Sequence, residues 1–223
     1  MFPFPFYFIA DPLLCAAPDD SGSDPGKDLV KILEAAIDGG ARLAQYRDKD
    51  RPRKEKYEIA KAMREVSRLR GVTLIINDDI DLASAVGADG VHLGQDDLPI
   101  WVARKALGEK AIVGVSTHSL QEAVQAESEG ADYIGFGPVF KTQTKESRYP
   151  VLGIESIAEV KRRVRVPLYA IGGIRLARLP EIIGAGAEGV AVVSALAGDI
   201  RLNVAKWTDF LNKEIARKLD KKG

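Results

Sequence analysis

Eight short apolar segments along the chain alternate with longer segments whose apolar residues recur at helical spacing. The short segments are nearly continuous apolar runs, which is typical of parallel strands that are covered on both faces. We predict strands over residues 6–11, 41–48, 73–77, 90–94, 112–116, 133–139, 167–172 and 189–194. We predict helices over residues 28–38, 54–69, 80–86, 99–107, 119–128, 154–163, 176–183 and 201–218. Eight repeats of a strand followed by a helix predict an α/β fold, a single (β/α)8 TIM barrel that spans residues 1–223.

A short Gly-Ala repeat falls between predicted helices and the strands that follow them. It occurs at Gly40-Ala41, Gly87-Ala88, Gly130-Ala131 and Gly186-Ala187. Glycine there allows the left-handed turn that ends a helix, and the small alanine allows a tight turn into the next strand. We interpret the repeat as a stabilising feature of the barrel end that is remote from catalysis.

The charge balance of the chain excludes a general attraction to nucleic acid or to an anionic membrane. The 223 residues include 32 basic and 32 acidic side chains, so the formal net charge is zero. A phosphate site must therefore come from a local arrangement of cations. We predict small-molecule substrates as partners, with no nucleic acid and no membrane, and the sequence leaves a homodimer open.

The apolar N-terminal run has little in common with a signal peptide. No Lys or Arg precedes the run, two prolines interrupt it and Asp11 ends it. Leu14, which precedes the single cysteine Cys15, is larger than the residue that a lipoprotein cleavage site requires. One cysteine excludes an intramolecular disulfide and is typical of a reducing compartment. We therefore predict a cytoplasmic protein whose first apolar run is a buried strand.

Polar residues at the carboxyl ends of the predicted strands carry the candidate chemistry, because the active sites of such barrels lie there. The second strand ends in Gln45, Arg47 and Lys49, which share one face at a spacing of two residues. An arginine fork together with a lysine point charge is suited to a polyphosphate. A solvated loop with a chance charge pattern is the alternative interpretation of this trio.

Acidic residues follow the third and fourth predicted strands. Asn77-Asp78-Asp79 follows the third, and Gly94-Gln95-Asp96-Asp97 follows the fourth. Aspartate is also a favoured helix N-cap, so each pair of aspartates alone is a weak indication of function. Beside the cations of the second strand, the carboxylates predict a Mg²⁺ site that is shared with a substrate diphosphate.

The later strand ends complete the candidate site. Ser116 and His118 follow the fifth strand without the G-x-S-x-G turn of a hydrolase nucleophile, and His118 has either a structural or a catalytic role. The long connection over residues 140–153 is rich in hydroxyls and cations, which is typical of a phosphate-gripping lid. Gly172-Gly173 and Ser194 end the last two strands, where backbone N–H groups of barrels often bind a phosphate.

Six motifs follow one another in order between Gln45 and Ile174, within a resemblance to a known family that spans roughly residues 6–196. They are Gln45-x-Arg47-x-Lys49, Ile76-Asn77-Asp78-Asp79, Gly90-Val91-His92-Leu93-Gly94-Gln95-Asp96-Asp97, Gly114-Val115-Ser116-x-His118, Gly137-Pro138-Val139-Phe140-x-Thr142-x-Thr144-Lys145 and Ile171-Gly172-Gly173-Ile174. Together they resemble the thiamine-phosphate synthase family, which shares a superfamily with the thiazole tautomerases. The resemblance implies a (β/α)8 barrel, in agreement with the strand count. It also implies a transferase that joins 4-amino-2-methyl-5-hydroxymethylpyrimidine diphosphate to 4-methyl-5-(2-phosphoethyl)thiazole, or its carboxylate, and releases diphosphate.

The same resemblance implies roles for individual residues. It implies a dissociative mechanism in which Arg47, Lys49, Ser116 and Lys145 are catalytic, and it assigns Mg²⁺ to Asp78 and Asp97. The implied contacts of the pyrimidine diphosphate are Gln45, Tyr46, Arg47, Asp48, Lys49, Asn77, Ser116 and Lys145. The implied contacts of the thiazole phosphate are Thr142, Gln143, Thr144, Gly173, Val193 and Ser194.

Two alternative functions stay open at this point. A thiazole tautomerase would use a histidine at the position of His118, and the segments around His118 and Phe140 are similar to those of the tautomerases. The paired aspartates and the Gln-x-Arg-x-Lys trio favour the synthase, because the tautomerases usually lack both. The other alternative is a sensor that binds thiamine precursors without turnover. Residues 13–25 follow no pattern of the family, so the sequence predicts no role for this first loop.

Overall fold

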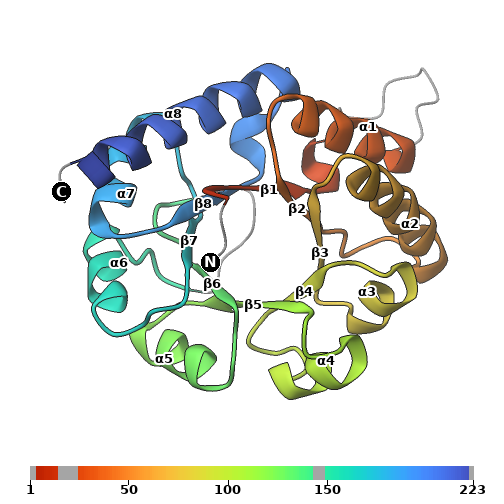
Figure 1. Cartoon of the computed structure of the whole chain (residues 1–223), viewed down its shortest axis with the longest axis horizontal. Coiled ribbons are helices and arrows are strands. Elements are labelled where there is room, and N and C mark those ends of the chain that lie inside the picture. The colour runs from red at the N-terminus through yellow and green to blue at the C-terminus, as the bar shows by residue number, and fades with distance from the viewer. Residues whose placement is uncertain (1–3, 15–24, 143–148, 221–223) are drawn as a thin grey trace.

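The predicted barrel is present in the computed structural model, which describes residues 4–14, 25–142 and 149–220. Eight parallel strands pair in sequence order, and β1 pairs with β8 to close the sheet (Figure 1). The strands are β1 (Phe6–Ala10), β2 (Leu43–Tyr46), β3 (Thr73–Asn77), β4 (Gly90–Leu93), β5 (Ile112–Thr117), β6 (Tyr133–Phe136), β7 (Leu168–Ile171) and β8 (Gly189–Val192). The fold class predicted from the sequence is confirmed.

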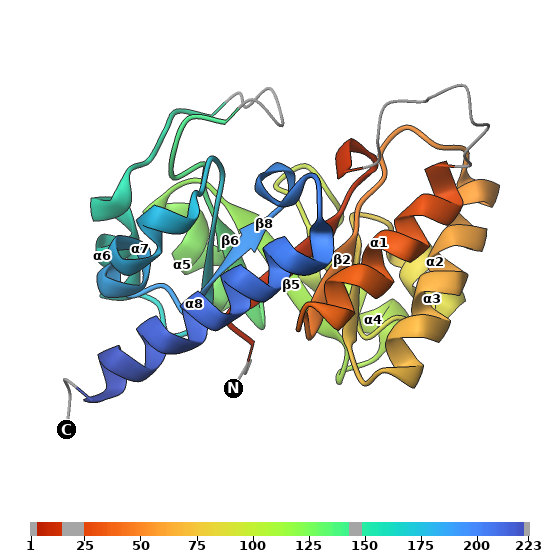
Figure 2. The same ribbon diagram turned by 90° about the horizontal axis from the view of Figure 1, so that it is seen from above.

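Helices form an outer ring around the strands (Figure 1), and α8 crosses the outside of the barrel in the perpendicular view (Figure 2). The α-helices are α1 (Pro25–Asp38), α2 (Arg53–Leu69), α3 (Ile80–Val86), α4 (Ile100–Leu107), α5 (Leu120–Ser128), α6 (Ile154–Lys161), α7 (Leu179–Ala185) and α8 (Ile200–Asp220). Short 3-10 helices are η1 (Pro12–Leu14), η2 (Leu176–Arg178) and η3 (Ser194–Leu196). The helix predicted over residues 176–183 thus begins as η2 and continues as α7. Across the described ranges, no helix combines the length and the apolar character that a membrane crossing needs.

Six predicted strands extend one to three residues past the observed carboxyl ends, and two of them have a clear physical cause. The strand predicted over residues 41–48 stops at Tyr46, because Asp48 turns the chain. The Asp48 carboxylate accepts hydrogen bonds from the N–H groups of Asp50 and Arg51, at 3.3 and 3.2 Å. The strand predicted over residues 133–139 ends before Pro138, which has no N–H group for a strand ladder.

The Gly-Ala repeat ends four helices in the same way. Gly87 and Gly186 adopt left-handed conformations, with φ of +63° and +117°, that favour glycine. In each repeat the alanine N–H donates to the carbonyl five residues earlier. These bonds are Ala41 to Ala36 (3.0 Å), Ala88 to Ala83 (3.0 Å), Ala131 to Ala126 (2.9 Å) and Ala187 to Ile182 (3.4 Å). The predicted role of the repeat as a helix stop is confirmed.

An acidic residue follows three of these Gly-Ala pairs and links neighbouring strands; the three are Asp89, Asp132 and Glu188. Each side chain accepts a hydrogen bond, at 2.7–2.8 Å, from a backbone N–H near the start of the preceding strand. Each also forms an ion pair, at 2.8–3.1 Å, with a basic side chain of an earlier helix. The basic partners are Arg64, Arg104 and Lys161, in the same order. The amino end of the barrel is therefore stabilised by an arrangement that recurs before β4, β6 and β8.

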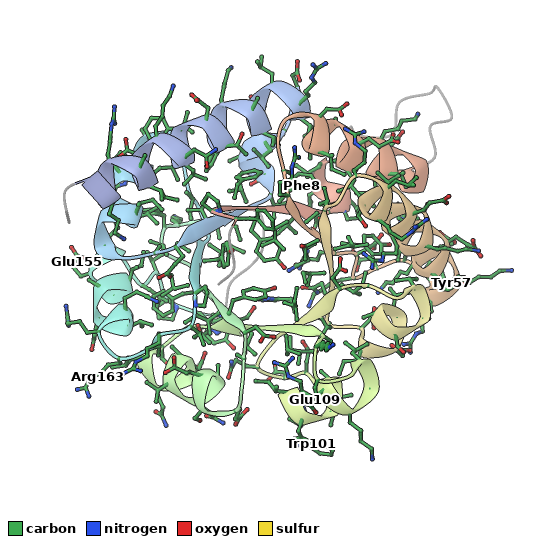
Figure 3. All side chains as sticks on the ribbon, in the orientation of Figure 1. Phe8, Tyr57, Trp101, Glu109, Glu155 and Arg163 are labelled. Carbon is green, nitrogen blue, oxygen red and sulfur yellow. The ribbon has the colours of Figure 1, made fainter. Side chains whose placement is uncertain are left out.

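Buried apolar side chains form one layer inside the barrel and another between the barrel and the helices. The inner layer contains Tyr7, Tyr133 and Tyr169, which pack edge to face with ring centroids 5.5–5.7 Å apart. The outer layer includes the fully buried Phe8, which Figure 3 labels between β1 and the surrounding helices. The three tyrosines form the floor beneath the carboxyl end of the barrel.

Replacing Gly114 with alanine is expected to lower the free energy of unfolding by about 1–3 kcal/mol. A Cβ at this position would lie 2.0 Å from Cζ of Tyr133, so the tyrosine ring would have to move. Chemical denaturation measures the change. Gly184→Ala is the matched control, because its Cβ would meet nothing within 4 Å and alanine favours the helical conformation of α7. Equal stability of wild type and Gly114→Ala would contradict this packing.

Candidate active site

A cavity of about 430 Å³ opens at the carboxyl ends of the strands, and residues on or directly after every strand line it. The structure brings together many of the side chains that the sequence predicts for the site. The predicted residues that line the cavity are Gln45, Arg47, Lys49, Asn77, Asp78, Asp97, Ser116, Thr142, Gly173, Val193 and Ser194. Gln143, Thr144 and Lys145 were also predicted and lie outside the described residues.

Two predicted contacts of the pyrimidine diphosphate, Tyr46 and Asp48, do not line the cavity. The Tyr46 side chain belongs to the apolar layer between barrel and helices, where burial raises the pKa of its hydroxyl and the nearby Asp48 carboxylate raises it further. The Asp48 carboxylate is paired with Nε of Arg51 at 2.7 Å. Because successive residues of a strand point to opposite faces, Gln45 and Arg47 face the cavity while Tyr46 and Asp48 face away. The side chains of Tyr46 and Asp48 therefore stabilise the end of β2, and their assignment to the substrate stays a prediction.

Carboxylates hold both cations that follow β2. The Arg47 guanidinium donates to the Asp11 carboxylate, whose side chain is 4% exposed. Asp11 also accepts a hydrogen bond from the Leu13 N–H at 3.0 Å, so its orientation is fixed. Nζ of Lys49 lies 3.2 Å from Oδ2 of Asp78. Asp11 is a site residue that the sequence analysis missed, although it follows the first strand and carries the same signal as the other polar strand ends.

Asp78 and Asp97 form the acidic side of the cavity. Asp78 has a φ of +61°, a left-handed conformation that is uncommon for a residue with a side chain and often accompanies function. Its N–H donates to the His92 carbonyl at 2.8 Å. Oδ2 of Asp97 accepts a hydrogen bond from the Gly94 N–H at 2.6 Å. Partial desolvation raises the pKa of Asp97, and the neighbouring Asp78 carboxylate raises it further.

The donor set of the cavity fits Mg²⁺ in partnership with a phosphate ligand. Over the part of the chain that the structure describes, no group of three or more His, Cys, Asp or Glu side chains is arranged to hold a metal ion. Asp78 and Asp97 nevertheless share one cavity, and the raised pKa of Asp97 reflects, besides desolvation, a repulsion that a divalent cation would relieve. Mg²⁺ typically binds through one or two carboxylates, with substrate phosphates and water completing its shell. The two aspartates therefore fit a Mg²⁺–diphosphate pair.

His118 lies in the cavity wall, at the start of α5. Its Nδ1 is 3.0 Å from Oε2 of Glu122, which also accepts the His118 backbone N–H at 2.7 Å. The imidazole stacks on Tyr149 with ring centroids 3.5 Å apart and an interplanar angle of 8°. These contacts give His118 a structural role, and its position in the wall keeps it within reach of a ligand.

The ends of β7 and β8 form the side of the cavity across from the aspartates. Gly172 and Gly173 both have positive φ, +94° and +63°. A Cβ on Gly173 would lie 2.4 Å from the Lys141 carbonyl oxygen, so this glycine also allows the segment after β6 to pack closely. Ser194 starts η3 directly beyond β8. A substitution at Gly173 would therefore disturb the fold as well as any ligand bound there.

The fold and the site together define an enzyme of the (β/α)8-barrel class, with cations and carboxylates gathered at the carboxyl ends of the strands. The model of a family described as thiamine monophosphate synthase matches residues 7–196. The thiamine-phosphate synthase of Chloroflexus aurantiacus is 45% identical over 177 residues, which are 79% of this chain and 82% of that protein. The thiamine-phosphate synthase of Methanospirillum hungatei is 41% identical over 207 residues, 92% of this chain and 96% of that protein. A solved structure of thiamine phosphate pyrophosphorylase from Pyrococcus furiosus aligns with a TM-score of 0.82 and 35% identity, covering 96% of this chain and 98% of that one.

The chain belongs to the thiamine monophosphate synthase family. Its activity is that of a thiamine-phosphate synthase, a transferase of thiamine biosynthesis, and the activity predicted from the sequence is confirmed. The relatives are named as synthases, which favours this activity over the thiazole tautomerase and the sensor.

Proposed function

We propose that the protein couples 4-amino-2-methyl-5-hydroxymethylpyrimidine diphosphate to the thiazole phosphate in a Mg²⁺-dependent reaction, with the two substrates on opposite sides of one cavity. One observation carries this proposal. Arg47 and Lys49 share the cavity with Asp78 and Asp97, while Ser194 lies beyond the end of β8. The cations are suited to a diphosphate, the carboxylates to a cation that binds with it, and the strand ends of β7 and β8 to a second phosphate.

The diphosphate side of the site is organised before a ligand binds. Asp11 holds the Arg47 guanidinium in place, and Asp78 holds the Lys49 ammonium. Charges that are already oriented stabilise a developing negative charge without reorganisation, which is usually a large part of catalysis. We assign the pyrimidine diphosphate to Gln45, Arg47, Lys49, Asn77 and Ser116, and to Lys145 from outside the described residues.

Asp78 and Asp97 would hold Mg²⁺, which supplies charge neutralisation to the diphosphate when it is bound. The bond between the pyrimidine methylene carbon and the diphosphate oxygen breaks, and both electrons leave with the diphosphate. The cation left on the methylene is delocalised into the aminopyrimidine ring. The thiazole nitrogen then donates its lone pair to that carbon and forms the new C–N bond. Arg47 and Lys49 stabilise the charge that grows on the leaving oxygen, so the protein needs no nucleophile of its own.

Turnover by the purified chain tests the proposal. With both substrates and Mg²⁺, thiamine phosphate and diphosphate are expected in equal amounts, and excess chelator should abolish both until Mg²⁺ is added back. A tautomerase would exchange a proton of the thiazole carboxylate phosphate without forming either product. A sensor would bind both precursors and form no product. Full activity in excess chelator would disprove the metal assignment.

Ser194→Ala is expected to raise the KM for the thiazole phosphate by about 10-fold, because it removes the hydrogen bond of the Ser194 hydroxyl to the charged phosphate and leaves the backbone N–H groups in place. The KM for the pyrimidine diphosphate should change little, and two-substrate steady-state kinetics measure both. Ser194→Ala tests the phosphate contact better than a substitution of Gly173 would. A Cβ added at Gly173 would clash with the Lys141 carbonyl and disturb the fold as well. Ser128→Ala is the control, because the Ser128 hydroxyl donates to the Gln125 carbonyl at the far end of α5. An equal rise in both KM values would show that the cavity is divided differently.

A further inference from the structure

A line of hydrogen bonds crosses the barrel floor beneath the active site and joins Gln45 to Ser116. Nε2 of Gln45 donates to the Tyr7 hydroxyl at 2.7 Å, and the hydroxyls of Tyr7 and Tyr133 lie 2.7 Å apart. The Tyr133 hydroxyl lies 3.0 Å from Nδ1 of His92, and Nε2 of His92 lies 2.9 Å from Oγ of Ser116. The members come from β2, β1, β6, β4 and β5, and both ends of the line face the active-site cavity.

The residues that surround this line of hydrogen bonds leave space for its buried rings. Tyr133 is fully buried and His92 is 8% exposed. A Cβ on Gly114 would lie 2.0 Å from Cζ of Tyr133, and a Cβ on Gly135 would lie 3.1 Å from Cε1 of His92. Two glycines on neighbouring strands therefore leave the space that the two rings occupy.

The donors and acceptors along the line fit a single direction, in which each hydroxyl accepts from one neighbour and donates to the next. In this direction the Gln45 amide nitrogen donates to the Tyr7 oxygen, and the Tyr7 hydroxyl donates to Tyr133. Burial raises the pKa of both tyrosines, so each keeps its one hydrogen. Tyr133 then donates to Nδ1 of His92, and the hydrogen of the imidazole lies on Nε2, where it is donated to Ser116.

We propose that Tyr7, Tyr133 and His92 are positioning residues that set which hydrogen-bonding group Gln45 and Ser116 present to the substrate. With its oxygen accepting from His92, Ser116 presents its hydroxyl hydrogen to the cavity as a donor. With its nitrogen bonded to Tyr7, Gln45 presents its carbonyl oxygen as an acceptor. The inference rests on the proposed function, in which both residues contact the pyrimidine diphosphate. An acceptor is suited to the amino group of the ring and a donor to a phosphate oxygen.

The tautomer of His92 is the first test, and it needs no substrate. The chain has two histidines, so ¹⁵N spectra of the imidazole nitrogens contain two sets of signals, and His118→Gln identifies the other set. We expect a hydrogen on Nε2 of His92 and none on Nδ1 in the wild-type protein. In Tyr133→Phe this single form should be replaced by a mixture of tautomers. A hydrogen on Nδ1 in wild type would overturn the proposed direction.

Kinetics then test whether the line acts on the reaction through Ser116. Tyr133→Phe is expected to lower kcat by about 10-fold with little change in the KM for the thiazole phosphate. Tyr169→Phe is the matched control, with kcat within about twofold of wild type. Tyr169 packs in the same tyrosine cluster, but its hydroxyl donates to the Phe4 carbonyl at 2.7 Å, outside the line.

A double-mutant cycle separates a positioning role from a general loss of stability. In a Ser116→Ala background, Tyr133→Phe should lower kcat little further, because the group on which Tyr133 acts is already absent. Losses that multiply would overturn the proposal. If Tyr133→Phe fails to fold, the tautomer of His92 in the wild-type protein still tests the proposed direction of the hydrogen bonds. A wild-type protein with the expected tautomer but no Mg²⁺-dependent coupling would overturn the proposed function alone.

Discussion

Changing Asp97 to asparagine is expected to lower kcat by about 10²–10³-fold, the loss typical of one electrostatic catalytic group. Asp97 and Asp78 are the acidic pair of the cavity, and their mutual repulsion contributes to the raised pKa of Asp97. With one carboxylate replaced by a neutral amide, the pair has one negative charge left to attract Mg²⁺, so the Mg²⁺ concentration for half-maximal activity should rise as well. Initial rates across a Mg²⁺ titration measure both effects.

The matched control for this change is Asp79→Asn. Asp79 follows Asp78 directly, but its carboxylate pairs with Lys56, 3.5 Å away, and it does not line the active-site cavity. Its kcat and Mg²⁺ dependence should stay within a few-fold of wild type. If Asp97→Asn behaves like the control, Asp97 does not hold the metal.

Arg47→Ala is expected to lower kcat by about 10²–10³-fold, because the charge on the diphosphate grows as its bond to carbon breaks. Arg47→Lys should restore only part of the activity, since a point charge does not replace the two-pronged guanidinium. Asp11→Asn should give an intermediate loss. Its amide oxygen can still accept from the Leu13 N–H, but the ionic partner that orients Arg47 is gone. Single-turnover and steady-state rates with both substrates measure these losses.

Arg42→Ala is the control for Arg47. Arg42 lies just before β2, and its guanidinium donates to the backbone carbonyls of Ile37 and Ala41, at 3.2 and 2.8 Å. It contacts no part of the cavity, so its loss should change stability and leave kcat near the wild-type value. A kcat for Arg47→Ala close to that of Arg42→Ala would contradict the diphosphate assignment.

Local patterns in the sequence were sufficient to predict the barrel. Apolar runs and helical spacing are properties of neighbouring residues, so the strands and helices follow from them within a few positions. The same alternation also placed Gln45, Arg47 and Lys49 together on one face. The same alternation places Tyr46 and Asp48 on the opposite face, away from the cavity. Their assignment to the substrate came from the family resemblance alone.

Contacts between distant strands could not be predicted in the same way. Tyr7 and Tyr133 are separated by 126 residues, and nothing local to either indicates that their hydroxyls meet. His92 stands in a short apolar strand, which marks it as unusual but not as a partner of Ser116. Asp11 is different, because it follows the first strand as the other site residues follow theirs, so its place in the cavity could have been predicted from the sequence.

The Gly-Ala pairs and the acidic residues that follow them lie at the end of the barrel opposite to the active site. Asp89, Asp132 and Glu188 join β3 to β4, β5 to β6 and β7 to β8 there, so these three strand pairs are linked at a distance from the loops that carry Arg47 or Asp97. Those loops are free to diverge in sequence while the barrel stays closed. The Gly-Ala pair recurs before β2, β4, β6 and β8, so it divides the ring into four modules of two strands and two helices. Three of these modules carry the acidic link, and Arg42 takes its place before β2.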